Sequence, residues 1–434
     1  MNVKYFNTKN IQSEIVNNYE INKVLIVFFG FLAVLNPMSA VITSFIYLLS
    51  KKNESESNYF IFFITLCTWI SLVNMGKIPS SDQIVYTRMF YEVPRSGFYG
   101  TMFESSYCSR HESVYRFIVW VGYYLALGNS KFFFFMISFT IYMLHYLATY
   151  KVLKHIGASK LAILCGVLSL TFFTQYFVMT LQLIRQMLGT AIIIYAIAQR
   201  AVTGRNAWWW LLAGCLTHTS SMFLATLSLI PWFYRKLTGR RLWICIGVVT
   251  FVLLFGDIIA GLLAGSTQID LFNYAMERMS TKQDDGLGAM KQSIMMTIFI
   301  PLMIVVTKLL LTNDYTNEVI IENGKMERTS AIYPFIYIGI FTMLYVLSMT
   351  GSPLIQYRFF YFSYSFIPFL LPLLLKPGRL WESPYFVVVS LFFIIRFFML
   401  YDDMTWKYPP LVDVLLIPMP YYFIQEFYHF NFMP

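Results

Sequence analysis

Long apolar segments follow one another along almost the whole chain, and short polar connections separate them. About 12 of these segments approach the roughly 20 residues that a helix needs to cross a bilayer. Because lipid cannot satisfy open backbone polar groups, the pattern predicts an all-α, polytopic membrane protein. The segments cover 24–49, 59–76, 114–128, 132–153, 161–181, 183–199, 207–233, 242–264, 293–311, 331–350, 356–375 and 385–401, with a weaker one at 410–425.

The composition strengthens this interpretation. Of the 434 residues, 58% are hydrophobic and only 12% are charged, whereas soluble folds carry about a quarter charged residues. No polar segment is long enough to form a separate soluble domain, so we expect a single transmembrane domain over 1–434. The first apolar segment is longer than a signal-peptide core, and we expect it to be retained as a span.

Basic residues predict which connections face the cytoplasm. The formal net charge of +10 would suggest nucleic acid in a soluble protein, but most Lys and Arg lie in short connections between apolar segments, so we expect topology signals and no nucleic-acid partner. The alternative is attraction to anionic lipid or a phosphorylated substrate. The expected orientation is outward for the polar loop 77–113 and the loop 265–292, and cytoplasmic for the loop 312–330.

Two segments do not fit a simple count of crossings. The segment 207–233 lies between two basic clusters but is too short for two spans, which predicts a re-entrant hairpin broken at 217–221. Broken backbone at that depth is tolerated only beside protein or a water-filled cavity. The segment 114–128 either crosses the membrane or only dips into it, and the second alternative places the N-terminus outside.

Familiar signatures of soluble enzymes are missing. The sequence has no P-loop and no dinucleotide-binding glycine pattern, and His111-Glu112 lacks the second histidine of a zinc-binding helix. The carboxylate pairs at 284–285 and 402–403 do not extend into the acidic spacing that holds magnesium on a diphosphate. Cysteines lie mostly within apolar segments and predict no disulfide framework. We therefore expect no essential metal and no cofactor.

Two arginines at the ends of apolar segments are candidates for a function. Arg185 lies between Gln182 and Gln186, and on one continuous helix these three side chains share a face. Arg358 occupies a similar place in a later segment. An intramembrane arginine is a functional candidate by default, and two outward-facing arginines would grip a pyrophosphate through their planar forks. The alternative for each arginine is a side chain that snorkels to the headgroups.

Titratable residues near polar breaks complete the candidate set. His218, at the expected hairpin break, is either a general base or a hydrogen-bonded structural histidine. Asp82 is expected near the start of a helix, with Tyr86 one turn later; the pair suits sugar binding, and the alternative is a plain helix cap. Glu112 is a second acidic candidate, and its alternative is an ion pair with Arg116.

The order and spacing of these residues resemble the EpsG family of exopolysaccharide polymerases, which is related in role to Wzy-type O-antigen polymerases. The resemblance covers roughly residues 60–365. It rests on Asp82, Tyr86, Tyr91, Glu112, Tyr115, Arg185, Gln186, His218, Ser220, Arg358 and Tyr361. The chain departs from the pattern at Ser81, where many relatives have glycine, and at Ser113, where many have proline.

The resemblance implies a membrane-embedded, metal-independent glycosyltransferase of the bacterial inner (cell) membrane. Such enzymes work at its outer face and join oligosaccharide repeat units, carried on undecaprenyl pyrophosphate, into O-antigen, capsule or exopolysaccharide. The residues implied for pyrophosphate binding are Arg185, Arg358 and Gln186. Those implied for accepting the proton of the attacking hydroxyl are His218, Asp82 or Glu112. Those implied for contacting sugars are Tyr86, Tyr91 and Tyr361.

The implied partners are undecaprenyl-pyrophosphate-linked glycans, membrane lipid, and a flippase and a chain-length regulator of the same pathway. Two other functions stay open: a flippase or other transporter of lipid-linked glycan, and a ligase that attaches finished glycan to another acceptor. A transporter more often shows broken helices in matching halves, and the sequence shows one candidate break, at His218.

Overall fold

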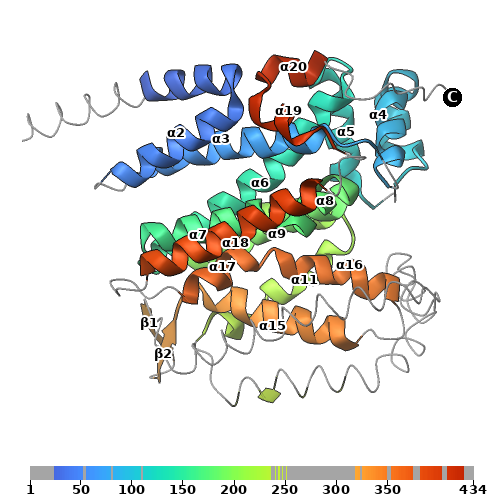
Figure 1. Cartoon of the computed structure of the whole chain (residues 1–434). Helices are drawn as coiled ribbons and strands as arrows, with labels where there is room; N and C mark the ends of the chain where they lie inside the picture. Colours follow the sequence, from blue (N-terminus) through green and yellow to red (C-terminus); the bar gives the residue numbers. More distant parts are fainter. Residues whose placement is uncertain are drawn as a thin grey trace, which may run out of the picture. The chain divides into compact units, whose positions relative to one another are not determined.

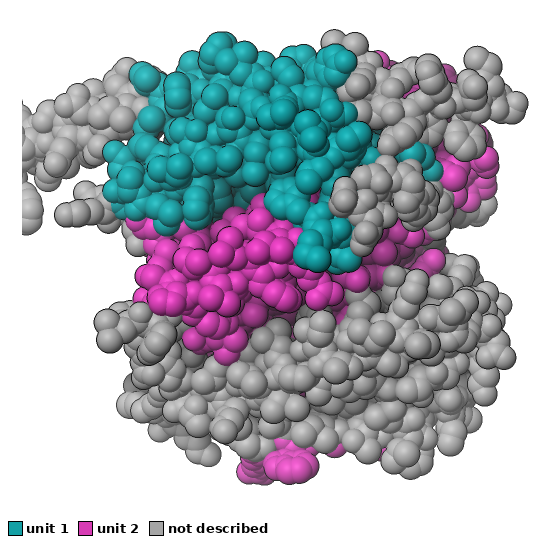
Figure 2. Space-filling view, in the orientation of Figure 1, with its two compact units in different colours: residues 1–79, 129–139, 398–434 teal, residues 80–128, 140–397 magenta. Residues whose placement is uncertain are grey.

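A computed structural model of the chain describes 24–51, 55–79, 82–108, 111–235, 318–322, 325–348, 353–374, 382–402 and 408–424, with 240, 243–244, 247 and 251. This part of the chain is predominantly helical (Figure 1). It divides into two compact units (Figure 2). Unit 1 comprises the described residues of Met1–Pro79, Asn129–Phe139 and Phe398–Pro434, and unit 2 comprises those of Ser80–Gly128 and Thr140–Phe397.

Unit 1 begins with a helix over Val24–Leu35. The other helices wholly within this unit are α2 (Pro37–Ser50), α3 (Glu56–Met75), α19 (Leu411–Leu416) and α20 (Met419–Ile424). The single span predicted at 24–49 is wrong, because the chain leaves the helix at Asn36 (φ −154°) and Pro37 starts the next one. The Asn36 side chain caps α2 by accepting from the Ser39 amide at 2.7 Å. Its amide also donates to the carbonyl of Leu415 at 3.1 Å, which joins α2 to α19.

Unit 2 holds most of the described chain. Its helices and turns up to residue 234 are α4 (Asp82–Tyr99), the π-helix η1 (Gly100–Glu104), α5 (Ser113–Leu125), α7 (Lys160–Thr171), α8 (Thr174–Gln182), α9 (Ile184–Thr203), α10 (Trp208–Thr217), α11 (Ser221–Ser228) and η2 (Pro231–Tyr234). Its later elements are β1 (Glu318–Glu322), β2 (Lys325–Thr329), α15 (Tyr333–Ser348), α16 (Pro353–Tyr364), α17 (Ile367–Leu370) and η3 (Leu371–Leu374). Two long helices, α6 (Ser130–His155) and α18 (Glu382–Asp402), contribute residues to both units.

The expectation of an all-α chain needs one correction. Strands β1 and β2 pair antiparallel, with Glu318 opposite Thr329 and Glu322 opposite Lys325, inside the loop predicted at 312–330. The β-branched run Val319-Ile320-Ile321 favours an extended backbone there.

The described residues contain three helices that are long and apolar enough to cross a membrane: α3, α6 and the Glu382–Tyr401 part of α18. The pair α7 and α8, bent by 55°, makes a fourth if it forms one span. This does not confirm about 12 transmembrane helices. The single helices predicted at 161–181 and 356–375 are interrupted. The predicted spans 242–264 and 293–311 lie largely or wholly outside the described residues, as does the loop 265–292.

Candidate functional site

A break in the backbone sets the position of Arg185. Helix α8 ends at Gln182, Leu183 is non-helical (φ −117°, ψ 50°), and α9 begins at Ile184. The prediction that Gln182 shares one continuous helical face with Arg185 and Gln186 is therefore wrong. Arg185 instead lies in the first turn of α9, a helix of 20 residues that ends where Gly204 takes a left-handed conformation (φ 71°).

The predicted break at 217–221 is confirmed. Helix α10 ends at Thr217, His218 is extended (φ −154°, ψ 132°), and α11 starts at Ser221. The Trp210 ring of α10 packs on Tyr195 with ring centroids 4.9 Å apart, while Arg200 donates to the carbonyl of Ser228 at the end of α11. Both ends of the α10–α11 hairpin therefore lie toward the C-terminal half of α9. Its entry into a membrane from one side stays a prediction.

Glycines let the hairpin approach α9 closely. A Cβ atom at Gly189 would overlap the hydroxyl of Ser221 and lie 3.1 Å from the carbonyl oxygen of Gly214. A Cβ atom at Gly214 would lie 2.5 Å from Cδ1 of Ile193. Larger residues at these positions would push the helices apart, and the tip that carries His218 would move relative to Arg185.

Glu112 occupies the centre of the site. It immediately precedes α5, at the helix N-cap, and its side chain is only 2% exposed. Its Oε1 atom lies 2.5 Å from Nδ1 of His218, and its Oε2 atom pairs with Nη1 of Arg185. Residues 112, 185 and 218, far apart in the sequence, therefore form one buried cluster, which we call the Glu112 cluster.

The Glu112 cluster keeps its carboxylate ionised. Burial by itself would raise the pKa of Glu112, but the hydrogen bond and charge of His218 and the charge of Arg185 outweigh it, and the pKa falls below its ordinary value of 4.5. When the His218 imidazole is neutral, the charged carboxylate beside it favours the tautomer in which Nδ1 carries the proton and Nε2 can accept one.

Arg185 retains a donor for a ligand. Its guanidinium lies over the Tyr86 ring, 5.3 Å from the centroid, and its Nε atom is 3.4 Å from the Tyr86 hydroxyl. Within the described part of the chain, Nη2 has no hydrogen-bond partner. Tyr86 is 2% exposed and lies on α4 one turn after Asp82, the first residue of that helix as predicted.

The predicted alternative of an ion pair between Glu112 and Arg116 is wrong. Arg116 is completely buried, and its guanidinium donates to the carbonyl oxygens of Met102 at 2.8 Å, Ser105 at 2.8 Å and Cys108 at 2.6 Å. It therefore fastens the segment that follows α4 onto α5. Sequence reasoning missed this role, because backbone carbonyls leave no signal in the sequence.

Arg358 forms a second, more open pair. Its Nη2 atom lies 4.0 Å from Oδ2 of Asp82, with side chains 42% and 38% exposed. The side-chain amide of Gln186 donates to the backbone carbonyl of Arg358 at 2.6 Å, which ties α16 to the first turn of α9. Gln186 therefore joins the two arginine sites. Pyrophosphate binding by Gln186 stays a prediction.

The other two predicted tyrosines pack on neighbouring aromatic rings. Tyr91 is 53% exposed and packs edge-on against Phe90; five residues after Tyr86, it points to a different side of α4. Tyr361 is 1% exposed and packs on Tyr364. Sugar binding by either residue stays a prediction.

The Glu112 cluster combines a histidine with a free ring nitrogen, a carboxylate that orients it, and a guanidinium with an open donor. Such a set can accept a proton and stabilise a developing anion. No group of three or more His, Cys, Asp or Glu side chains placed to hold a metal ion occurs among the described residues. Metal independence stays a prediction.

Comparison with known proteins identifies the family. The EpsG family model matches residues 58–411, which is most of the chain. No curated protein and no solved structure was found to match. EpsG proteins are polysaccharide polymerases, and the apolar helices described above mark this chain as a membrane protein. The chain belongs to the EpsG family.

Proposed function

We propose that this protein polymerises oligosaccharide repeat units carried on undecaprenyl pyrophosphate into a surface polysaccharide, as a multi-pass protein working at the outer face of the bacterial inner membrane. The observation that carries the proposal is the buried carboxylate of Glu112 held between His218 and Arg185. A buried carboxylate with a histidine and an arginine is costly to build for stability alone, and family membership supports a polymerase.

The proton transfer follows from the orientation of His218. Glu112 accepts from Nδ1 and fixes the ring, which leaves Nε2 to act as the base. The hydroxyl oxygen of the acceptor sugar attacks the anomeric carbon of the donor glycan, and its proton passes to Nε2. The new glycosidic bond forms as the bond between the anomeric carbon and the pyrophosphate oxygen breaks, and the pyrophosphate keeps the electron pair.

The departing pyrophosphate needs cations. Arg185 offers its open Nη2 atom, and Arg358 is exposed enough to exchange Asp82 for a phosphate oxygen. Because Gln186 joins α9 to the backbone of Arg358, the two guanidinium groups belong to one connected part of unit 2. Arginine suits this role because its planar fork donates two parallel hydrogen bonds to phosphate.

The test uses purified full-length protein in liposomes with the lipid-linked repeat unit of its own cell and no nucleotide sugar. The wild-type protein is expected to convert the repeat unit into a ladder of longer lipid-linked glycans on a gel. The near-isosteric variants Glu112→Gln and His218→Gln are expected to lose this conversion, whereas the matched controls Glu56→Gln and His155→Gln keep it.

Three results would contradict the proposal. Movement of the lipid-linked glycan between leaflets without elongation would identify a transporter. Transfer of glycan only to a non-lipid acceptor would identify a ligase. Undiminished elongation by Glu112→Gln and His218→Gln would remove the Glu112 cluster from the reaction.

A further inference from the structure

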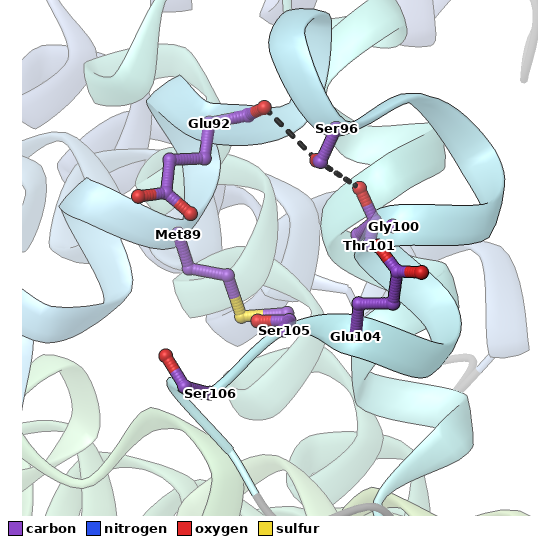
Figure 3. Close-up of a pocket in the computed structure, with 8 residues that line it drawn as sticks. All are labelled: Met89, Glu92, Ser96, Gly100, Thr101, Glu104, Ser105 and Ser106. Carbon is purple, nitrogen blue, oxygen red and sulfur yellow. Dashed lines mark hydrogen bonds between the residues drawn. The ribbon is translucent and has the colours of Figure 1, made fainter.

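A small polar pocket lies where α4 gives way to η1 (Figure 3). The α-helix is interrupted at Gly97 (φ 62°), and the chain continues into the π-helix η1, an element that is frequent at functional sites. Gly100 permits this close turn, because a Cβ atom there would lie 2.7 Å from Cβ of Ser96. The polar residues lining the pocket are Glu92, Ser96, Thr101, Glu104, Ser105 and Ser106.

The hydrogen bonds already made leave the pocket rich in acceptors. Ser96 donates to the carbonyl of Glu92 at 3.0 Å, and Thr101 donates to the carbonyl of Gly97 at 2.7 Å. Each hydroxyl has one proton, so both keep their oxygen lone pairs as acceptors. The two hydroxyls lie 3.0 Å apart, side by side in Figure 3.

The carboxylates add more acceptors. One oxygen of Glu92 accepts from the hydroxyl of Tyr107 at 2.5 Å. Glu104 has no hydrogen bond or ion pair with any described residue. The buried hydroxyl of Ser105 likewise has no partner within the described part of the chain. Two glutamates and several hydroxyl-bearing residues therefore line the pocket, and its lining includes no Lys or Arg.

The hydrogen-bond acceptors that line the pocket indicate which class of ligand it can bind. A phosphate group is disfavoured, because it would face two carboxylates without a cation. A group of hydroxyl donors is favoured, because each can donate to a charged or lone-pair acceptor. We propose that the α4–η1 pocket binds an uncharged sugar residue of the glycan through its hydroxyl groups, as a saccharide subsite separate from the groups that bind pyrophosphate. This inference rests on the proposed function.

Arg116 links the subsite to the reacting groups. Its guanidinium binds the carbonyls of Met102 and Ser105, which belong to the segment that borders the pocket. Its own backbone amide donates at 3.1 Å to the carbonyl of Glu112, the N-cap residue immediately before α5. A sugar in the pocket would therefore be held by a segment that is hydrogen-bonded directly to α5, the helix that Glu112 caps.

The experiment measures binding without the reaction. The probe is the repeat-unit oligosaccharide of the producing cell, released from its lipid and free of phosphate, titrated into full-length protein in detergent and followed by calorimetry. Glu104→Gln keeps the shape of the side chain and removes its charge, and we expect it to weaken oligosaccharide binding about tenfold. Its affinity for inorganic pyrophosphate is expected to be unchanged. Glu56→Gln serves as the matched control, and thermal unfolding checks that each variant is folded.

Different experimental outcomes would overturn the saccharide subsite and the proposed function. Equal oligosaccharide affinity in wild type and Glu104→Gln, or no binding to the wild type, overturns the subsite. Calcium or magnesium binding that is lost in Glu104→Gln, with oligosaccharide binding unaffected, overturns it in favour of a cation site. If the variant loses affinity but the wild-type protein does not elongate glycans, the subsite stands and the polymerase proposal fails. If the wild-type protein elongates and Glu104→Gln does so with an unchanged KM, the polymerase stands and the subsite fails.

Discussion

Two carboxylate–arginine pairs lie in unit 2, and they differ mainly in burial. In the first, Glu112 and Arg185 are 2% and 19% exposed and in direct contact. In the second, Asp82 and Arg358 are 38% and 42% exposed and 4.0 Å apart. An exposed pair contributes about 0–1 kcal/mol to stability, whereas removing one partner of a buried pair costs about 3–5 kcal/mol. The contribution to stability is therefore expected to be large for the buried pair and small for the open pair, and the proposed exchange of Asp82 for another anion depends on this difference.

The largest effect is expected for Glu112→Ala. This change leaves Arg185 and His218 without their shared partner, so the free energy of unfolding should fall by about 3–5 kcal/mol and glycan elongation should be lost. Thermal unfolding and the elongation assay measure the two effects. A variant as stable as wild type would show that the pair is not closed in the membrane.

Arg185→Lys should act on catalysis more than on stability. The charge beside Glu112 is kept, but the fork that reaches a phosphate oxygen is lost, and we expect elongation to slow by about 10²-fold. Initial rates at saturating donor give the measurement. A rate equal to that of wild type would mean that a point charge is enough and that Nη2 of Arg185 does not contact the leaving group.

Asp82→Asn tests the open pair. The stability should change by less than about 1 kcal/mol. Arg358 is released by the change, so affinity for inorganic pyrophosphate should stay the same or rise about two- to threefold, which corresponds to roughly 0.5 kcal/mol. Calorimetric titration at low and high salt checks this, with Arg358→Gln as the opposite variant. Loss of pyrophosphate binding in Asp82→Asn would give Asp82 a direct role in the reaction.

The pH dependence of stability tests the buried pair of Glu112 and Arg185. The pKa of Glu112 is lowered in the folded protein, so its stabilising contribution is fully present above the unfolded value of about 4.5 and is lost as pH falls through the lower folded value. The contribution of Glu112 to the Tm difference between wild type and Glu112→Gln should therefore begin to shrink only below about pH 5. A difference that shrinks well above pH 5 would contradict the pairing.

The smallest effect is expected for Tyr86→Phe. The ring stays against Arg185, and only a long hydrogen bond of 3.4 Å is removed, so stability should change by about 0.5 kcal/mol or less. Tyr86→Leu removes the ring as well and should cost more, by about 0.5–1 kcal/mol. Equal unfolding temperatures for the two variants would exclude a contribution from the ring.

The sequence predicted the individual polar residues of the site better than their partners. A polar interruption in an apolar segment located the break at His218, and Pro79-Ser80-Ser81 located the helix start at Asp82. Both signals are local, because turn and capping residues act on their own backbone. They needed no knowledge of the packing.

The partners depend on tertiary structure. Nothing in the order of residues distinguished Arg116 from Arg185 as the partner of Glu112, because both are single arginines near polar positions. The break at Leu183 carries no proline or glycine and left no mark in the pattern. It places Gln182 and Gln186 in different helices, and Gln186 donates to the Arg358 carbonyl. The candidate site was therefore predicted as a set of residues, and its connections were found only in the fold.

The close contact of α9 with the α10–α11 hairpin also has a consequence for synthesis of the protein. Glu112 and Arg185 precede His218 in the chain, and the glycine-lined contact at Gly189 and Gly214 requires all three helices to be present. During synthesis, the Glu112 cluster therefore cannot form until the α10–α11 hairpin has left the ribosome and packed against α9. An unfinished chain that ends before the hairpin lacks His218, the proposed base.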